Sequence, residues 1–415
     1  MLNLHTITDE CRICKSVNFQ EVIDFKEMAL TGVFLELGSS VPIAPLRLVR
    51  CKSCNLVQLG NSYDPRVLYG ETYGYESHLN SSMVHHLQQK ARILEKRFLG
   101  SLENAIVLDI ASNDGTLLSG YQGSQLTKVG IDPLINLVTD CYPSNSIKIP
   151  HFFSSAVYFN TLKRPANLVT SLSVIYDLED PVKFAAEVYE VLSDGGIWHF
   201  EQSYLPLMIE TNSYDTICHE HLLYLTLSDI HRILSEAKLQ ILDASINHIN
   251  GGSIAVTAIK SSSRVTASPF VDHLLSEERT SGILDGSKVN SFAENFRDHA
   301  SNLKNLLVKY KDLGFDLYGI GASTKGNVLL QAAGIDQDLI LAVGEVNSRK
   351  FGKQTPGSSI PIVPEASVLT SPYENKLLLV LPWHFRENLL PKLEDFLGGG
   401  GKLLFPLPRI EIVSS

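Results

Sequence analysis

Residues 105–118 read AIVLDIASNDGTLL, a buried-type apolar run followed by a short polar stretch and new apolar residues. This order predicts a strand, a tight turn and a helix. In a doubly wound sheet, such a turn lines the ligand crevice at the carboxyl end of the strand. We therefore expect an α/β fold in which Ser112, Asn113, Asp114 and Gly115 contact a ligand.

A second strand is expected at residues 128–131, and it ends in Asp132 and Pro133. Asp132 lies 18 residues after Asp114, and a carboxylate at this place can accept both hydroxyls of a ribose. This geometry fits NAD or S-adenosylmethionine. A dinucleotide needs G-x-G-x-x-G for close approach of backbone to pyrophosphate, whereas only Gly115 is present here. The turn therefore favours a nucleoside ligand without phosphates, with a purely structural turn as the alternative.

The alternation of helices and strands continues on both sides of this unit. Apolar residues at helical spacing predict a long helix from Tyr75 to about Phe98. Strands are expected at residues 166–171 and 197–201, and a helix at residues 182–192 between them closes in a turn at 193–196. A helix, a Gly-Gly turn and a strand in this order are typical of class I methyltransferases.

Four of the six cysteines form two C-x2-C pairs with 36 residues between them: Cys11 and Cys14, then Cys51 and Cys54. Two residues between thiolates allow a tight turn to aim both sulfurs at one ion, and two such turns complete a tetrahedral site that suits zinc. A redox pair is the alternative. Because four cysteines leave no position open for water, we expect a structural zinc and not a catalytic one.

His219, Glu220 and His221 form the densest cluster of titratable residues in the chain. Their spacing differs from H-E-x-x-H, in which both histidines lie on one helix face. On a loop, one histidine can act as a general base while Glu220 fixes its tautomer or shuttles a proton. A solvated helix start is the alternative.

A second α/β unit is expected near the C-terminus, with a strand at residues 315–320 and the turn GASTKG at 321–326 before a helix. The turn is not a P-loop, because Thr324 and not glycine precedes Lys325. Backbone N–H groups at a helix N-terminus, together with Lys325, suit the diphosphate of a sugar nucleotide. An NAD site with Glu345 as the ribose carboxylate is the rival, and a packing domain without a ligand is a third possibility.

The 415 residues are enough for two to four domains, and their net charge is −10. A negative field repels phosphate backbones, so we expect no nucleic-acid partner. No apolar run reaches the ~20 residues of a membrane span, and the first ten residues carry no secretory signal. We therefore expect a cytoplasmic protein without a membrane partner, and we favour a monomer.

As a set, these motifs resemble those of the bacterial nucleotide-sugar C-methyltransferases. Members of that family join a zinc-binding N-terminal domain, a central S-adenosylmethionine-binding domain and a smaller Rossmann-like C-terminal domain. They methylate C3 of an NDP-4-keto-deoxyhexose. The motifs that carry the resemblance are the cysteine pairs, YGYES at 73–77, SNDGTLL at 112–118, YDTICHEH at 214–221, NGGS at 250–253 and GIGASTKGN at 319–327.

The resemblance implies roles for the candidate site residues. His221 is the expected base, with Glu220 beside it, and Tyr75 donates to the sugar, with Tyr73 as the alternate. Ser173 joins the cofactor-binding residues named above. The expected substrate-binding residues are His219, Tyr224, Asn250, Ser323, Thr324 and Lys325.

The chain departs from the family pattern at Ser173, Asp177 and Cys218, which leaves the sugar and its stereochemistry open. The expected cofactors are S-adenosylmethionine and a structural zinc ion, and the expected partner is a nucleotide-diphospho keto-sugar. The expected domains span residues 1–70, 71–260 and 311–415, with a helical linker at 261–310. Two other functions stay open: an NAD-linked oxidoreductase that uses the C-terminal turn, and a non-enzymatic sugar-nucleotide binder.

Overall fold

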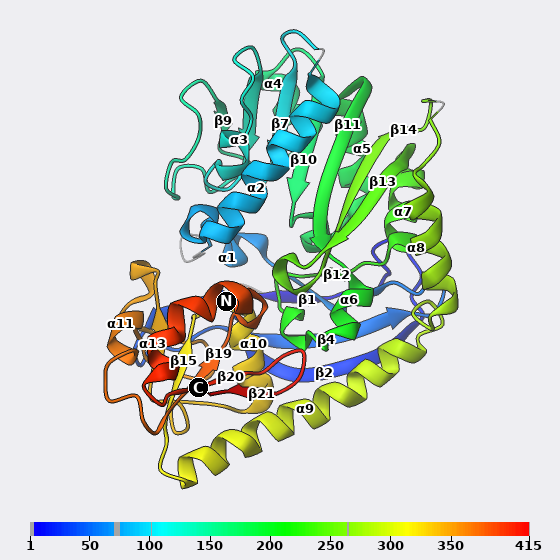
Figure 1. The fold of residues 1–415 in the computed structure, drawn as a ribbon. Helices are drawn as coiled ribbons and strands as arrows, with labels where there is room; N and C mark the ends of the chain where they lie inside the picture. The colour runs from blue at the N-terminus through cyan, green and yellow to red at the C-terminus, as the bar shows by residue number, and fades with distance from the viewer. Residues whose placement is uncertain (1–3, 70–74, 101, 264, 415) are drawn as a thin grey trace.

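The computed structural model describes residues 4–69, 75–100, 102–263 and 265–414. A large sheet with helices on both faces forms the upper half of Figure 1, and we call it the upper layer. A second α/β unit and the N-terminal strands lie below it, and together we call them the lower layer. No helix among the described residues combines the length and the apolar character that a bilayer crossing requires.

The upper layer is a seven-stranded sheet with the order β13-β14-β11-β10-β7-β8-β9. Strands β7 to β11 are parallel, and β14 runs antiparallel between β11 and β13. The chain order reverses between β7 and β10, so the carboxyl ends of these two strands flank the expected ligand crevice. The strands are β7 (Ile106–Ile110), β8 (Thr127–Ile131), β9 (Ile147–Ile149), β10 (Ala166–Leu172), β11 (Leu192–Ser203), β13 (Leu239–Asn247) and β14 (Ser253–Lys260).

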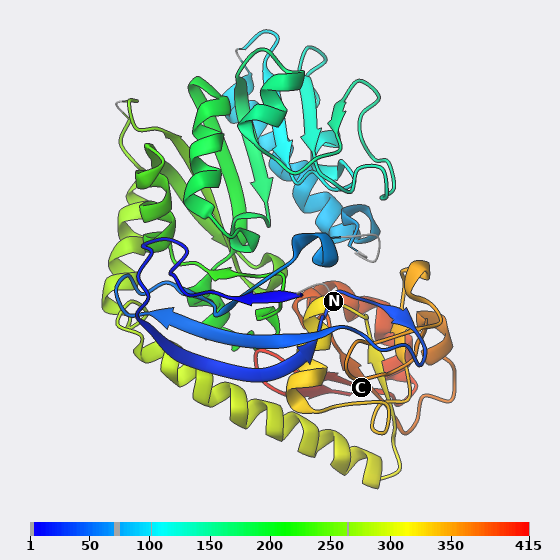
Figure 2. The ribbon, with the colours of Figure 1, turned by 180° about the vertical axis from the view of Figure 1, so that it is seen from behind.

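Helices cover both faces of this sheet. On one face α2 (Ser81–Leu94) packs against α3 (Thr116–Ser119), and α4 (Ser155–Thr161), α5 (Pro181–Val191) and α7 (Leu227–Glu236) cover the other (Figures 1 and 2). The expected helix at 75–98 begins later than the pattern suggested. The side chain of Asn80 accepts hydrogen bonds from Ser82 N and Met83 N and so caps α2, while Ser77–Leu79 form a separate 3-10 turn, η1.

The expected turn at residues 193–196 is wrong in one respect, because β11 already begins at Leu192. Ala166 pairs with Leu192 and Leu168 with Ile197, so β11 carries extra residues between these two pairs. These residues form a bulge inside the strand, and Gly195 takes a left-handed φ of 74° there.

The N-terminal part is a four-stranded antiparallel sheet with the order β12-β5-β4-β2. Its long strands are β2 (Phe19–Ala29) and β4 (Ile43–Cys51), which run beneath the upper layer in Figure 2. The edge strand β12 (Leu223–Tyr224) comes from the middle of the chain and pairs with β5 (Val57–Leu59). The smaller elements are β1 (His5–Ile7), paired with β6 (Asn61–Tyr63), β3 (Leu35–Glu36) and α1 (Pro65–Leu68).

The C-terminal part is a six-stranded sheet with the order β18-β16-β15-β19-β20-β21, in which only β21 is antiparallel to its neighbour. Its strands are β15 (Asp316–Ile320), β16 (Val343–Glu345), β18 (Ile362–Pro364), β19 (Lys376–Val380), β20 (Lys402–Phe405) and β21 (Glu411–Val413). Its helices are α10 (Thr324–Ala333), α11 (Glu365–Val368), α12 (Arg386–Leu389) and α13 (Glu394–Gly398).

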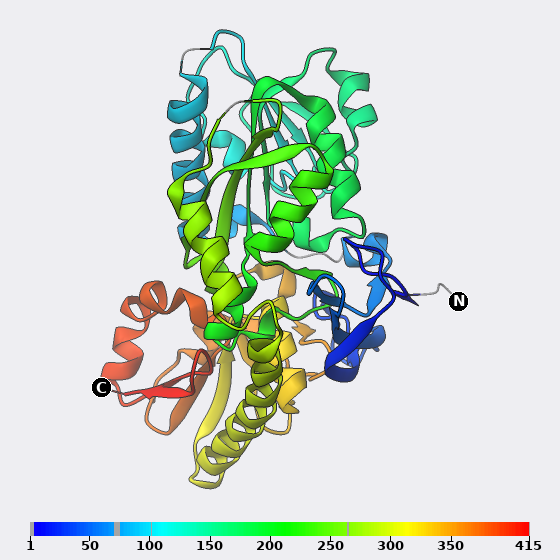
Figure 3. The same ribbon diagram turned by 90° about the vertical axis from the view of Figure 1, so that its right-hand side faces the viewer.

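Two helices connect the upper and lower layers: α8 (Pro269–Thr280) and α9 (Ser287–Asp312). One stripe of α9 is buried, with the side chains of Phe292, Phe296, Ala300, Leu303 and Leu307. In Figure 3 the N-terminal strands and the C-terminal sheet lie on opposite sides of α9. The pair of β3 with β17 (Lys353–Gln354) joins these two parts directly.

Candidate functional site

The four cysteines converge as the spacing predicts. The Sγ atoms of Cys11 and Cys54 lie 3.5 Å apart, those of Cys14 and Cys51 lie 3.6 Å apart, and all four fit within 4.8 Å. Zn–S bonds of about 2.3 Å in a tetrahedron place sulfurs roughly 3.8 Å apart, so the cluster fits zinc.

Each cysteine pair is held in a tight backbone turn. Lys15 N donates to Cys11 O and Asn55 N donates to Cys51 O, and both Lys15 and Asn55 take left-handed φ values of 60° and 72°. The second turn leads straight into β5, which pairs with β12. The metal cluster therefore positions β5, the strand that pairs with β12 just after His221.

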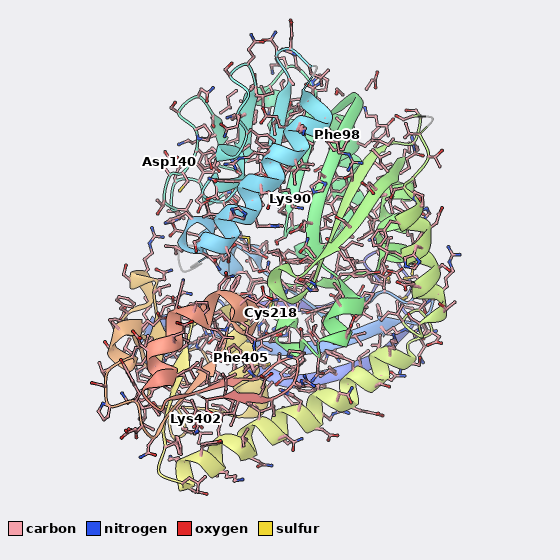
Figure 4. All side chains as sticks on the ribbon, in the orientation of Figure 1. Lys90, Phe98, Asp140, Cys218, Lys402 and Phe405 are labelled. Carbon is pink, nitrogen blue, oxygen red and sulfur yellow. The ribbon has the colours of Figure 1, made fainter. Side chains whose placement is uncertain are left out.

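His221 lies just before β12 and three residues after Cys218, which Figure 4 labels where the upper and lower halves of the molecule meet. Its Nδ1 donates to Thr216 O at 2.8 Å, which leaves Nε2 as the ring atom with a lone pair. The ring of Tyr176 contacts the imidazole edge-on at 4.4 Å between centroids. Burial, together with the charge of Lys325, lowers the pKa of His221 to about 4. The side chain is thus a neutral imidazole with a fixed tautomer, which can accept a proton.

Glu220 is buried, and Thr31 Oγ1 donates to its Oε2 at 3.4 Å. The predicted role in fixing the tautomer of a histidine is wrong for His221, because Thr216 O fixes it. Burial raises the pKa of Glu220, which suits a carboxyl group that holds or passes on a proton. A Cβ at Gly32 would lie 2.4 Å from Glu220 Oε1, so a larger residue there would displace the carboxyl group. The sequence pattern held no signal for Gly32.

His219 and Tyr224 are both buried. His219 Nε2 donates to Ala44 O of β4 at 3.3 Å, and its ring packs edge-on against Tyr63 of β6. The structure therefore does not bring His219 together with His221. Tyr224 lies in β12, and its hydroxyl has no hydrogen-bond partner among the described residues.

The expected cofactor turn lies between β7 and α3 and is built by left-handed residues. Asn113 and Gly115 have φ values of 47° and 85°, and Asp132 at the end of β8 accepts a hydrogen bond from Asn113 N at 2.9 Å. Burial raises the pKa of Asp132. Its Oδ1 accepts a hydrogen bond from Leu134 N at 2.7 Å. Pro133, the residue between Asp132 and Leu134, is half-buried. Each carboxylate oxygen retains a lone pair that can accept a ribose hydroxyl.

Tyr142, which the motifs did not indicate, lies next to this turn. Its hydroxyl lies 2.7 Å from Ser112 Oγ and donates to Asn113 O. A Cβ at Gly115 would lie 2.5 Å from its ring, and one at Gly130 would lie 2.6 Å from it. Only glycine therefore lets the backbone approach Tyr142 this closely.

Asp109, also missed, lies in β7 just before the turn. Its Oδ1 accepts from Thr170 Oγ1 at 2.7 Å, so it links β7 to β10 at the point where the strand order reverses. Burial raises its pKa to about 7. Ser173, at the end of β10, is exposed with a φ of 60° and faces the same edge of the sheet.

Asn113 and Asp114 hold a second segment, residues 75–79, which we call the Tyr75 segment. Asn113 Nδ2 donates to Tyr75 O, and Asn113 Oδ1 accepts from Ser77 N, both at 3.2 Å. Asp114 Oδ2 accepts from His78 N at 2.8 Å and from His78 Nδ1 at 3.0 Å. Tyr75 is 46% exposed as a residue, whereas burial of its phenol group raises the pKa of the hydroxyl. The alternate, Tyr73, lies outside the described residues.

The C-terminal turn reaches the same junction. Ser323 caps α10 by accepting from Gly326 N, and Thr324 is the first residue of the helix. Lys325 extends across to the upper layer and donates to Asn250 O at 2.6 Å, where Asn250 has a φ of 53°. Burial lowers the pKa of Lys325. Three expected substrate residues and Asn250 therefore meet at the boundary between the layers.

A second contact across this boundary was not predicted. Trp383 Nε1 donates to Asp215 Oδ2 at 2.8 Å, and Asp215 is fully buried beside α10. Glu345, proposed above as a ribose carboxylate, accepts from Ala322 N, Val346 N and Asn347 N. The two carboxylate oxygens of Glu345 are therefore occupied by backbone N–H groups of the turn before α10 and of the two residues that follow Glu345.

Three family models match successive parts of the chain. A zinc binding domain matches residues 11–69, a methyltransferase domain matches residues 83–244, and a C-methyltransferase C-terminal domain matches residues 248–408. The C-methyltransferase NovU of Streptomyces niveus is 28% identical over 413 residues, which cover 98% of this chain and 97% of NovU.

Solved structures also show partial likeness. Magnesium protoporphyrin IX methyltransferase from Synechocystis PCC 6803 is 14% identical with a TM-score of 0.33, covering 47% of this chain and 92% of its own. An S-adenosylmethionine-dependent methyltransferase from Clostridium acetobutylicum is 13% identical with a TM-score of 0.29, covering 41% and 98%.

The cofactors follow from the domains and their donor groups. The cysteine cluster fits zinc, and the turn with Asp132 fits the nucleoside of S-adenosylmethionine. Because the three models succeed one another and NovU matches almost the whole length, the chain is identified as an S-adenosylmethionine-dependent C-methyltransferase that carries a zinc-binding domain and a C-methyltransferase C-terminal domain.

Proposed function

We propose that this enzyme methylates the carbon beside the ketone of a nucleoside-diphospho-4-keto-deoxy-sugar, at C3, in the synthesis of a branched sugar. A hydrogen on such a carbon is acidic because the charge left behind spreads onto the ketone oxygen. The reaction needs one base, an alignment of two carbons and donors for the enolate oxygen.

His221 is the proposed base. Its Nδ1–H is held by Thr216 O at 2.8 Å, and its pKa of about 4 keeps Nε2 unprotonated at neutral pH. The imidazole therefore takes the proton from carbon without first losing one of its own. Glu220, buried one residue away with a raised pKa, is the proposed group that passes the proton on.

When bound, S-adenosylmethionine supplies an electrophilic methyl group on a positively charged sulfur. The proposed residues that hold it are Ser112, Asn113, Asp114, Gly115, Asp132, Pro133 and Ser173. Asp132 is suited to the ribose hydroxyls, and the hydroxyl pair of Ser112 and Tyr142 shapes the turn. Tyr75 is the proposed donor to the sugar, since its segment is bonded directly to Asn113.

The nucleotide is proposed to lie at the start of α10. Ser323, Thr324 and the cation of Lys325 face the boundary with the upper layer, where Asn250 contributes its carbonyl. A cation and the N-terminus of a ten-residue helix together attract a diphosphate. No observation in this region favours NAD, because Glu345 is occupied by backbone donors.

The observation that carries the proposal is the neutral, oriented His221 within the cluster of Lys325 and Tyr176. The test incubates the purified protein with S-adenosylmethionine and enzymatically generated 4-keto sugar nucleotides carrying TDP, GDP or CDP. A product heavier by about 14 mass units, the gain of one CH2, supports the proposal. Absence of that product with all three nucleotides would refute the sugar-nucleotide substrate.

A further inference from the structure

A short segment of the C-terminal layer meets the Tyr75 segment. It is the 3-10 turn η6 (Ser348–Lys350), and Arg349 Nη1 lies 2.5 Å from Glu76 Oε1. The side chain of Glu76 is only 3% exposed, and its Oε2 accepts from Thr139 N at 2.8 Å. A buried carboxylate of the upper layer is therefore neutralised by a cation of the lower layer.

The turn η6 is hydrogen-bonded to the turn at residues 321–326, before α10, where the nucleotide is proposed to bind. We call residues 321–326 the nucleotide turn. Lys350 Nζ donates to Ala322 O at 2.7 Å, and Glu345 Oε2 accepts from Ala322 N at 2.9 Å. Arg349 N donates to Asn347 Oδ1 at 3.0 Å. Ala322 immediately precedes Ser323, so a shift of the nucleotide turn moves the backbone that carries Arg349.

At its other end, the Tyr75 segment is fastened to the cofactor turn. Asn113 bonds both sides of Glu76, at Tyr75 O and Ser77 N, and Asp114 accepts from His78 N. The contacts thus run without interruption from the nucleotide turn through Lys350, Arg349 and Glu76 to the cofactor turn. Every link is a hydrogen bond, an ion pair or a peptide connection between neighbours.

We infer that Arg349 is a positioning residue that couples occupancy of the nucleotide turn to the affinity of the cofactor turn. The inference rests on the proposed function, since it requires a nucleoside diphosphate at residues 321–325. Separating the half-exposed Arg349 from Glu76 leaves that buried carboxylate with Thr139 N as its hydrogen-bond donor but without a cation from the lower layer, so the paired arrangement is favoured. A ligand that stabilises the docked lower layer therefore stabilises the ordered cofactor turn, and linkage makes the effect reciprocal.

The test is calorimetric titration of the full chain with S-adenosylhomocysteine, alone and with saturating TDP. The expected result is tighter binding of S-adenosylhomocysteine in the presence of TDP, by a factor of about 5 or more. The ratio of the two affinities is expected to fall to about 1 in Arg349→Met and to recover in part in Arg349→Lys, which keeps the charge. Arg409→Met, which removes an exposed cation of the same layer, is expected to leave the ratio unchanged.

The outcomes separate this inference from the function on which it rests. If both ligands bind but the wild-type ratio is 1, or if the ratio survives in Arg349→Met, the coupling is refuted and the substrate proposal stands. If neither TDP nor GDP, CDP or UDP binds, the nucleotide-sugar substrate is refuted and the coupling with it. Glu76→Gln gives an independent measurement, since it removes the charge from the other partner, and its ratio is also expected to fall to about 1.

Discussion

At the scale of single residues, the charge state of His221 has a direct kinetic consequence. An ordinary histidine has a pKa near 6.5, whereas burial and Lys325 lower that of His221 to about 4. The neutral form is the active one, so protonation on the acid side removes activity. We expect kcat/KM for the keto-sugar to stay level from about pH 8 to pH 6 and to fall only as the pH approaches 4. A decline already centred near 6.5 would contradict this assignment.

Replacement of the base tests the same residue without a change of pH. His221→Asn keeps a polar side chain but cannot take the proton, so kcat should fall by about 10²–10⁴. Binding of S-adenosylhomocysteine should be unchanged, because the cofactor turn makes no contact with His221 in the described hydrogen bonds. His231→Asn, on the exposed side of α7, is the matched control and should retain full activity.

Gly32 gives a second prediction at this scale. In Gly32→Ala the new methyl group would lie 2.4 Å from Glu220 Oε1, so the carboxyl group must move. Overpacking of this kind costs about 1–3 kcal/mol, and we expect kcat to fall by about tenfold with the zinc retained. Gly398→Ala, where a Cβ meets no atom within 4 Å, is the control. Equal kcat in both variants would show that Glu220 has no part in turnover.

At the scale of elements, the zinc cluster is tied to the base through two paired strands. Leu59 N donates to Leu222 O at 2.9 Å, directly beside His221, and β5 follows the second cysteine turn. We expect one zinc per chain, and in Cys54→Ser we expect loss of zinc and a fall in kcat of at least about tenfold. Zinc content by plasma mass spectrometry and initial rates are the measurements.

The control for this experiment is Cys141→Ser, a cysteine outside the four-cysteine cluster that lies beside His78 and Asp114, and the comparison is of zinc content. It should keep its zinc and rule out a general sensitivity to loss of a thiol. A zinc-free protein with full activity would show that the metal serves only the folding of the N-terminal strands.

These elements also show which parts of the fold and the site can be predicted from the sequence. The strand and turn at 105–118 and the cysteine cluster follow from periods and spacings of neighbouring residues, and the structure confirms them. The pairing of β12 with β5 joins residues 57 and 224, and no local pattern encodes such a long-range pair. The bonds from Asn113 to the Tyr75 segment were missed for the same reason. Tyr142 carried no motif, because its role depends on a ring fitting against two glycines.

At the scale of the whole molecule, Lys325 is the cation that crosses between the layers. Charge-assisted hydrogen bonds contribute about 1.5–3 kcal/mol, so Lys325→Met should raise KM for the sugar nucleotide by roughly 10-fold to 100-fold. The affinity for S-adenosylhomocysteine should be unchanged. Lys309→Met, on the exposed face of α9, is the control. An unchanged KM in Lys325→Met would remove the start of α10 from the substrate site.

The chain holds two tryptophans, and they report on different places. Trp198 is fully buried in the upper sheet and donates to Ser171 Oγ, whereas Trp383 belongs to the lower layer and donates to Asp215 of the upper one. A Trp198→Phe variant would therefore emit from the boundary alone. The emission maximum of Trp383 should shift to longer wavelength if the layers separate and its indole is exposed to water. Fluorescence of this variant therefore reports whether the two layers stay in contact during turnover.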